Sequence, residues 1–228
     1  MKYDILLFDA DNTILDFDKA EEHALKRAFA ESDLHYDGNV LEVYRRNNIK
    51  QWRLFEQGVI KDKNEVLSSR FVETFKELGI ASDSSLTAEL YEKNLHNGFY
   101  VIYNAEVVLQ RLQRLNCRLY LVSNGVLSIQ NSRMKGSGMD KYFLKRFVSE
   151  EVGVPKPNKE YFDYCFSNID YFDLRKTIII GDSLTSDIQG GINAGIDTCW
   201  YNPKHNDNDS EITPTYEIDN LEQLFDII

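Results

Sequence analysis

Apolar and polar positions follow two different spacings along this chain. Ile5 to Phe8 form a short continuous apolar run, which predicts a strand buried on both faces of a parallel sheet. Short runs of β-forming residues predict further strands at Arg118–Val122, Arg146–Ser149, Thr177–Ile180, Asp197–Tyr201 and Tyr216–Ile218. Helical spacing predicts helices between them, at Ala105–Leu115, Leu127–Met134, Asn158–Asn168, Ser186–Asn193 and the C-terminus. Strands that alternate with helices indicate an α/β fold with a central parallel sheet.

The stretch between the first two strands has a helical pattern throughout. Apolar positions three and four residues apart predict a helix from Lys19 to Glu31, with Asp18 as its N-cap. Further helices are predicted over Asn39–Glu56, Lys63–Leu78 and Ser84–Leu95, with Gly58 as a break after the first of them. We therefore expect an all-helical domain, residues 17–97, inserted into an α/β core domain formed by residues 1–16 and 98–228.

Composition narrows the class of protein. The 228 residues are 43% hydrophobic and carry a formal net charge of −11. Because nucleic acid polymers and anionic membranes bind basic surfaces, the charge argues against both as partners. No apolar run is long enough to span a membrane, and no basic segment leads into an apolar one at the N-terminus. Cys117, Cys165 and Cys199 are expected to be free buried thiols in a reducing cytoplasm.

Two carboxylates follow the first strand directly, at Asp9 and Asp11. Residues two apart in extended backbone point the same way, so these groups should lie close together and repel each other. A divalent cation held by oxygen ligands would balance them. A turn before the next helix would explain one Asp and Asn12, but not a second Asp at the end of a buried strand.

A second acidic segment follows the strand Thr177–Ile180. Asp182 and Asp9, with the main-chain carbonyl of Asp11, would give Mg2+ three oxygen ligands. Asp187 has two interpretations that the sequence leaves open. It is either a first-turn residue of the next helix, where negative charge is favoured, or a direct part of the site.

Two further segments carry groups that suit a phosphate. Ser123 and Asn124 follow a strand, so that a hydroxyl, an amide and main-chain N–H groups could cradle an anion; their alternative role is to cap the next helix. Lys156 precedes Pro157, which favours extended backbone at Lys156 and stiffens the segment, so its ammonium group could be held near a phosphate. The alternative is a solvated lysine in a loop. Active sites of open α/β sheets lie at the carboxyl ends of the strands, where these residues converge.

In this order, the four segments resemble the motifs of the haloacid dehalogenase (HAD) superfamily. Its first motif is matched by Asp9-Ala10-Asp11-Asn12-Thr13, its second by Ser123, its third by Lys156-Pro157 and its fourth by Gly181 to Asp187. The resemblance implies a Rossmann-like core, a helical C1 cap and a Mg2+-dependent phosphomonoester hydrolase. It implies that Asp9 attacks phosphorus to form an aspartyl-phosphate, that Asp11 is the acid and base, and that Lys156 and Mg2+ neutralise charge. Ser123 and Asn124 would hold the phosphoryl group, and Thr13 would support the loop.

The insert is similar to that of the pyrimidine 5'-nucleotidase-like phosphatases, in Trp52 to Gly58, Arg70-Phe71 and Leu78-Gly79. This similarity implies a nucleoside 5'-monophosphate as substrate. The candidate residues for base recognition are Trp52, Phe55, Gln57 and Lys61, although the two aromatic residues could instead fill the helical core.

Three other functions remain open. The chain could be a sugar-phosphate or phosphoglycolate phosphatase, a haloacid dehalogenase or a non-catalytic scaffold. Asp11 and Asp182 argue against a dehalogenase, and the presence of every motif residue argues against a scaffold. We expect a cytoplasmic monomer or homodimer that acts on a small phosphorylated metabolite.

Overall fold

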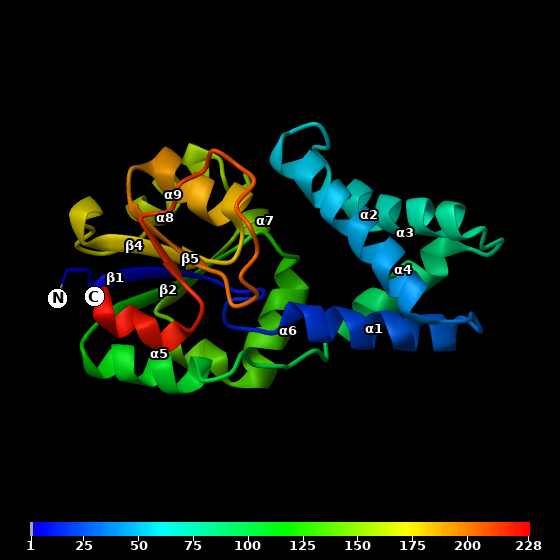
Figure 1. The fold of residues 1–228 in the computed structure, drawn as a ribbon, viewed down its shortest axis with the longest axis horizontal. Helices are drawn as coiled ribbons and strands as arrows, with labels where there is room; N and C mark the ends of the chain where they lie inside the picture. Colours follow the sequence, from blue (N-terminus) through cyan, green and yellow to red (C-terminus); the bar gives the residue numbers. More distant parts are fainter. Residues whose placement is uncertain (1) are drawn as a thin grey trace. The chain divides into compact units, whose positions relative to one another are not determined.

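The computed structural model describes residues 2–228, which contain one six-stranded parallel sheet. Its strands are β1 (Ile5–Asp9), β2 (Arg118–Ser123), β3 (Lys145–Val148), β4 (Thr177–Gly181), β5 (Asp197–Tyr201) and β6 (Tyr216–Ile218). Their spatial order is β3-β2-β1-β4-β5-β6, which is the order of the Rossmann fold. The predicted Rossmann-like core is therefore confirmed, with β1 between β2 and β4 (Figure 1).

Helices cover both faces of the sheet, which explains the continuous apolar run of β1. Leu6 and Phe8 pack with α5 (Ala105–Arg114) on one face. Ile5 and Leu7 pack with α8 (Lys159–Ser167) on the other. The core also contains α6 (Leu127–Ser137), α7 (Ser149–Val152), α9 (Gln189–Ala194) and four shorter helical segments: η1 (Met139–Tyr142), η2 (Leu174–Lys176), η3 (Leu184–Ile188) and η4 (Leu221–Asp226).

The register of the central strands brings three strand ends to one edge. Asp9 pairs with Val122, so Ser123 follows one position beyond it on β2. Phe8 pairs with Ile180, so Gly181 lies at the end of β4 beside Asp9. Parallel strands end at the same edge, and this is where open α/β sheets carry their sites.

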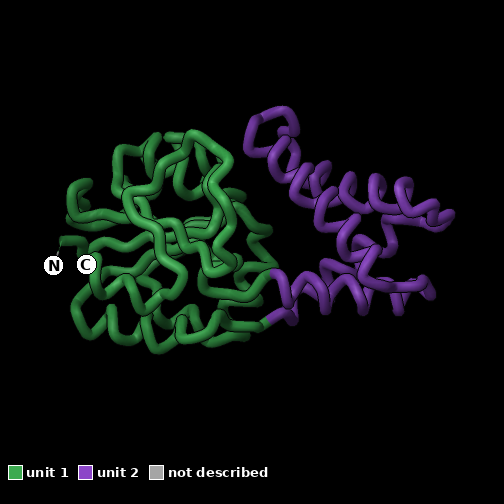
Figure 2. The backbone as a smooth tube through the Cα atoms, viewed as in Figure 1, with its two compact units in different colours: residues 1–17, 99–228 green, residues 18–98 purple. Residues whose placement is uncertain are grey.

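The inserted residues form a second compact unit (Figure 2). The chain up to Phe17 belongs with Phe99–Ile228, whereas Asp18–Gly98 forms the other unit. The insert contains α1 (Phe17–Glu31), α2 (Gly38–Glu56), α3 (Lys63–Leu78) and α4 (Ser84–Leu95). Rings of Tyr44, Phe71 and Tyr91 lie 5.0–5.4 Å apart at its centre.

Several predicted boundaries were wrong. Asp18 is not an N-cap, because α1 already begins at Phe17 and Asp18 lies in its first turn. Ser149 begins α7 and does not end β3. The helix predicted from Ser186 begins two residues earlier as a π-helix, η3, and the C-terminal helix is the 3-10 helix η4.

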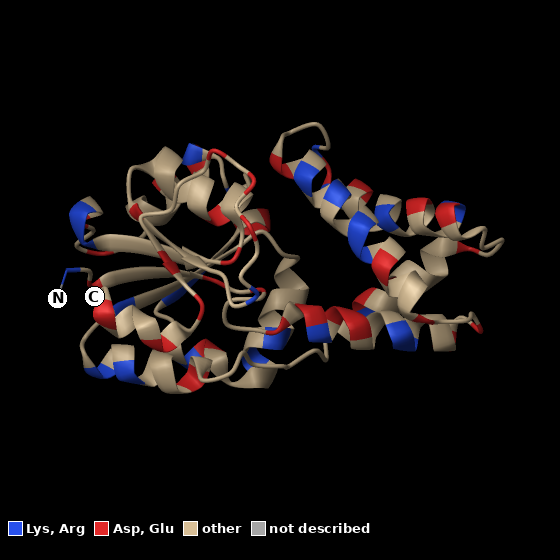
Figure 3. Ribbon diagram, viewed as in Figure 1, with Lys and Arg blue, Asp and Glu red and all other residues tan. Residues whose placement is uncertain are grey.

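The three cysteines are free and buried, as predicted. Among residues 2–228, none of the helices combines the length and the apolar character needed to cross a membrane. Figure 3 shows Lys and Arg interspersed with Asp and Glu on the helices of both units.

Candidate active site

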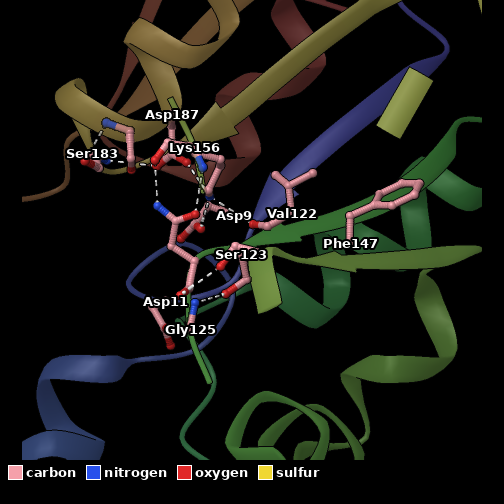
Figure 4. A network of polar contacts seen from close by, with 12 residues as sticks. Asp9, Asp11, Val122, Ser123, Gly125, Phe147, Lys156, Ser183 and Asp187 are labelled. Carbon is pink, nitrogen blue, oxygen red and sulfur yellow. Dashed lines mark hydrogen bonds and ion pairs between the residues drawn. The ribbon is translucent and has the colours of Figure 1, made fainter. Parts of the chain in front are cut away.

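Lys156 lies at the centre of the site, between two carboxylates (Figure 4). Its Nζ is 2.7 Å from Oδ1 of Asp9 and 2.7 Å from Oδ1 of Asp187, and it donates to the carbonyl of Val122 at 3.0 Å. The side chain of Lys156 is 1% exposed, so it is not a solvated loop lysine. Burial alone would lower the pKa of Lys156, but Asp187 and Asp9 raise it above its ordinary value. The ammonium group therefore stays charged beside Asp9.

Asp187 lies in the first turn of η3, as one of its two interpretations required, and its side chain is buried beside Lys156. Its Oδ2 accepts a hydrogen bond from the main-chain N–H of Ser183 at 3.1 Å, while Oδ1 faces Lys156. The π-helix η3 turns Asp187 back over the end of β4. A side chain at Gly181 would collide with it, since a Cβ there would lie 2.6 Å from the Cβ of Asp187. The side chain of Asp187 can therefore lie this close to the end of β4 only because residue 181 is a glycine.

Carboxylate oxygens of Asp9, Asp182 and Asp187 all lie within 4.8 Å of one another. Burial raises the pKa of Asp9 to about 8, with Asp187 and Asp11 acting in the same direction and Lys156 against them. Burial, together with Asp9 and Asp187, also raises the pKa of Asp182 well above its usual range. Three carboxylates face one ammonium group, and oxygen donors with excess negative charge suit a hard divalent cation such as Mg2+.

Ser123 and Asn124 lie beside this cluster, with different contacts. The Oγ of Ser123 accepts a hydrogen bond from the main-chain N–H of Gly125 at 3.0 Å. The side-chain amide of Asn124 forms two hydrogen bonds with the main chain of Lys156. Its Nδ2 donates to the Lys156 carbonyl and its Oδ1 accepts from the Lys156 N–H, each at 2.9 Å. Asn124 therefore positions Lys156, and its predicted contact with phosphate stays a prediction.

Asp11 is held by two residues that the sequence analysis missed. Gln130 donates to its Oδ2 at 2.5 Å, and Arg133 forms an ion pair with its Oδ1. Both lie on α6, where the buried positions are Ile129, Gln130, Arg133 and Met134. The sequence could have indicated these two residues, because the helical spacing of the four positions places them on the same face of α6 as the two apolar residues.

The remaining predicted residues have varied environments. Thr13 is buried in the loop after β1, where Leu15 N–H donates to the Ala10 carbonyl at 2.8 Å; its supporting role stays a prediction. In the helical unit, Phe55 is buried with Ile60 and Val66, and Trp52 packs against this cluster.

The contacts of these aromatic residues favour a packing role for both. Gln57 and Lys61 are exposed, and Gly58 between them has the left-handed φ of 71°. Any part that these residues take in substrate recognition stays a prediction.

Comparison with known proteins identifies the family. Residues 6–201 match the family described as haloacid dehalogenase-like hydrolase. The chain belongs to this family. The predicted family and the prediction of a hydrolytic enzyme are therefore confirmed.

Three relatives align over nearly their whole length. The HAD-hydrolase YfnB of Bacillus subtilis (strain 168) is 43% identical, covering 100% of this chain and 96% of the relative. A crystal structure of YfnB described as bound to magnesium superposes with a TM-score of 0.93, covering 100% of this chain and 99% of that chain. Pyrimidine 5'-nucleotidase PynA of Streptococcus pneumoniae (strain ATCC BAA-255 / R6) is 37% identical, covering 100% and 96%. Pyrimidine 5'-nucleotidase YjjG of Escherichia coli (strain K12) is 31% identical, covering 98% and 97%.

Proposed function

We propose that this HAD-family hydrolase is a Mg2+-dependent phosphomonoesterase that acts through an aspartyl-phosphate. The observation that carries the proposal is the carboxylate of Asp9 at the end of β1, with Lys156 at 2.7 Å and two more carboxylates beside it. An anionic nucleophile can approach an anionic phosphate only where positive charge offsets the repulsion. The buried ammonium of Lys156 supplies part of that charge at the required atom.

The reaction takes two steps. An Oδ atom of Asp9 attacks phosphorus, a new P–O bond forms and the ester P–O bond breaks, while Asp11 gives its proton to the departing oxygen. A water then attacks phosphorus, Asp11 takes its proton and the bond between phosphorus and Asp9 breaks. Inorganic phosphate leaves, and both carboxyl groups return to their starting states. Ser123 and the main-chain N–H groups beside it hold the phosphoryl oxygens.

The donor set fits a divalent cation. Asp9 and Asp182, with the main-chain carbonyl of Asp11, would hold it, and Asp187 would anchor Lys156 next to them. When bound, Mg2+ supplies positive charge to the phosphoryl group and lowers the repulsion between the carboxylates. The magnesium described for the YfnB structure supports this assignment.

The proposed substrate is a pyrimidine nucleoside 5'-monophosphate. Support comes from two relatives named pyrimidine 5'-nucleotidase, at 37% and 31% identity over nearly their full length. We further propose that the inserted residues 17–97 act as a cap domain on the core of residues 1–16 and 98–228. We also propose that the protein is a cytoplasmic monomer or homodimer.

The test measures release of inorganic phosphate from a panel of phosphomonoesters. The panel contains pyrimidine and purine nucleoside 5'-monophosphates, sugar phosphates, phosphoglycolate and p-nitrophenyl phosphate, each with Mg2+ and with EDTA. We expect the pyrimidine nucleotides to give the highest kcat/KM and EDTA to remove activity. Full activity in EDTA would contradict the metal assignment, and a sugar phosphate as best substrate would contradict the nucleotide assignment.

The Asp9→Asn variant tests the nucleophile. An amide cannot form the acyl phosphate, so we expect turnover of every phosphomonoester to be abolished while the protein remains folded. Asp140→Asn is the matched control, because Asp140 pairs with Arg146 outside the site. Wild-type turnover by folded Asp9→Asn protein would overturn the mechanism.

A further inference from the structure

The side chain of Gln130 bridges two residues with separate roles in the proposed reaction. Its Nε2 donates to Oδ2 of Asp11 at 2.5 Å and to Oγ of Ser123 at 2.9 Å. Its Oε1 accepts from Nη1 of Arg133 at 3.3 Å. Because Arg133 can only donate, it fixes Oε1 of Gln130 as the acceptor and leaves Nε2 to face Asp11 and Ser123. Gln130 is 2% exposed, so its amide has little access to water.

The bond to Ser123 determines how its hydroxyl can act. Oγ of Ser123 accepts from Gly125 N–H and from Gln130, which uses both lone pairs of the hydroxyl. Its own hydrogen is then directed to a third partner, which makes Ser123 a donor. A phosphoryl oxygen needs a donor of this kind. The close approach of Gln130 also requires glycine at position 125, since a Cβ there would lie 2.5 Å from Nε2 of Gln130.

Arg133 fixes the other oxygen of Asp11. Its side chain is fully buried, its guanidinium forms an ion pair with Oδ1 of Asp11, and it lies 5.3 Å from the ring centroid of Phe17. With Gln130 on Oδ2, both carboxylate oxygens of Asp11 are held from α6. A buried guanidinium destabilises the fold unless it is paired. Breaking the ion pair with Asp11 would therefore be unfavourable, and this holds Asp11 in place.

We propose that Gln130 and Arg133 are positioning residues, which together orient the acid–base carboxylate of Asp11 and set Ser123 as a hydrogen-bond donor to the phosphoryl group. The inference rests on the proposed function, since it assigns the residues that align its acid and base. Asp11 takes up a proton from solvent before the first step and gives it to the ester oxygen as the ester P–O bond breaks. In the second, Asp11 takes a proton from water as the bond between phosphorus and Asp9 breaks.

The leaving group separates positioning of Asp11 from a general structural role. A nucleoside alkoxide needs a proton to depart, whereas p-nitrophenolate is a weak base and departs without one. For Gln130→Ala we expect the rate of phosphoryl transfer from a nucleoside 5'-monophosphate to fall roughly 100-fold, the usual cost of a misplaced catalytic group. The first turnover of p-nitrophenyl phosphate should fall much less, because it loses only the support that Gln130 gives Ser123, and slow hydrolysis of the aspartyl-phosphate should follow. A burst of about one equivalent of p-nitrophenol should therefore appear, since Asp11 serves both steps.

The experiment compares rapid-mixing kinetics of wild type, Gln130→Ala and Asn131→Ala with both substrates. Asn131 is the next residue of α6, carries the same amide group and makes no hydrogen bond with Asp11 or Ser123 among residues 2–228, so its variant should behave as wild type. Arg133→Lys keeps the charge without the planar guanidinium and should show the same leaving-group pattern to a smaller extent. It carries the test if Gln130→Ala does not fold.

Two results would overturn the inference. One is unchanged kinetics in the folded variants, and the other is an equal loss on both substrates without a burst. Failure of the proposed function gives a different result, because wild-type protein would then release no phosphate from either substrate.

Discussion

At the scale of single residues, the site is dominated by the cost of burying charge. Three carboxylates share one ammonium group, and the pKa of Asp9 is raised to about 8 by burial, with help from Asp187 and Asp11. Charged groups in such a cluster stabilise one another only when a partner of opposite sign is present. The excess negative charge therefore lowers the stability of the free protein, and a bound cation would relieve it.

This cost predicts a pH dependence of stability in the absence of metal. The folded protein binds the Asp9 proton more tightly than the unfolded chain does, because the pKa rises from 3.8 to about 8. The contribution of Asp9 is therefore fully present below pH 4 and is lost as the pH rises towards 8. Asn at position 9 removes this titration. We expect the Tm of Asp9→Asn minus that of wild type, measured in EDTA, to increase from pH 5 to pH 8.

A differential Tm cancels the titration of groups that do not interact with Asp9, whereas Asp182, whose pKa Asp9 raises, remains part of the measured difference. Each 1 kcal/mol of difference moves the Tm by about 2–4 °C for a chain of this size, which scanning calorimetry resolves. For the control Asp140→Asn, the Tm of the variant minus that of wild type should stay constant from pH 5 to pH 8. A difference that grew towards low pH would contradict the raised pKa of Asp9.

The contacts of single residues were only partly predictable from the sequence. Asp9, Asp11, Lys156 and Asp182 could be predicted because each stands at a strand end or beside a proline, where local pattern is informative. Gln130 could not, because its contact with Asp11 joins positions 119 residues apart and local spacing carries no such pairing. The burial of Lys156 depends on the same kind of long-range contact, here with Asp9.

At the scale of elements, the connection from β4 to α9 shows how backbone shape creates the site. The helical pattern predicted a helix from Ser186, but the backbone begins two residues earlier with the π-helix η3. The wider turn brings Asp187 back towards Gly181, and Ser183 N–H fixes its carboxylate. Periodicity alone could not reveal this, since one π turn alters the spacing by a single residue.

Gly181→Ala tests that connection. The added Cβ would overlap the side chain of Asp187, which is held by Lys156 and by Ser183 N–H and so cannot move away freely. Overpacking of this kind costs about 1–3 kcal/mol. We expect a lower Tm and a loss of phosphatase activity, because Lys156 moves with its partner.

Gly38→Ala is the matched control for this substitution. A Cβ at Gly38 meets no atom within 4 Å, and alanine suits the first residue of α2. Its Tm and activity should therefore equal or slightly exceed those of the wild type. Wild-type values for Gly181→Ala as well would show that Asp187 does not need the close approach.

At the scale of the whole molecule, we expect chemistry and selectivity to depend on different parts of the chain. The candidate side chains of the α/β unit, such as Asp9, Ser123 and Lys156, have groups suited to the phosphoryl centre and its charge, which every phosphomonoester shares. They offer nothing that distinguishes one leaving group from another. We therefore infer that selectivity comes from the inserted helical unit.

Within that unit, the segment after α2 is the best candidate. Phe55 is buried with Ile60 and Val66, which favours a packing role, whereas Gln57 and Lys61 are exposed. An amide and an ammonium group can hydrogen-bond the polar edge of a pyrimidine. One such bond contributes about 0.5–1.5 kcal/mol, or roughly twofold to twelvefold in kcat/KM.

We expect Gln57→Ala and Lys61→Ala to lower kcat/KM for pyrimidine nucleotides by that factor relative to sugar phosphates, with p-nitrophenyl phosphate nearly unchanged. Lys76→Ala, an exposed lysine in the last turn of α3, should leave the ranking of substrates as it is. The measurement is kcat/KM for each variant across the same panel of phosphomonoesters. If the variants at positions 57 and 61 slowed every substrate equally, the segment would serve the packing of the helical unit, and substrate choice would have to come from other residues.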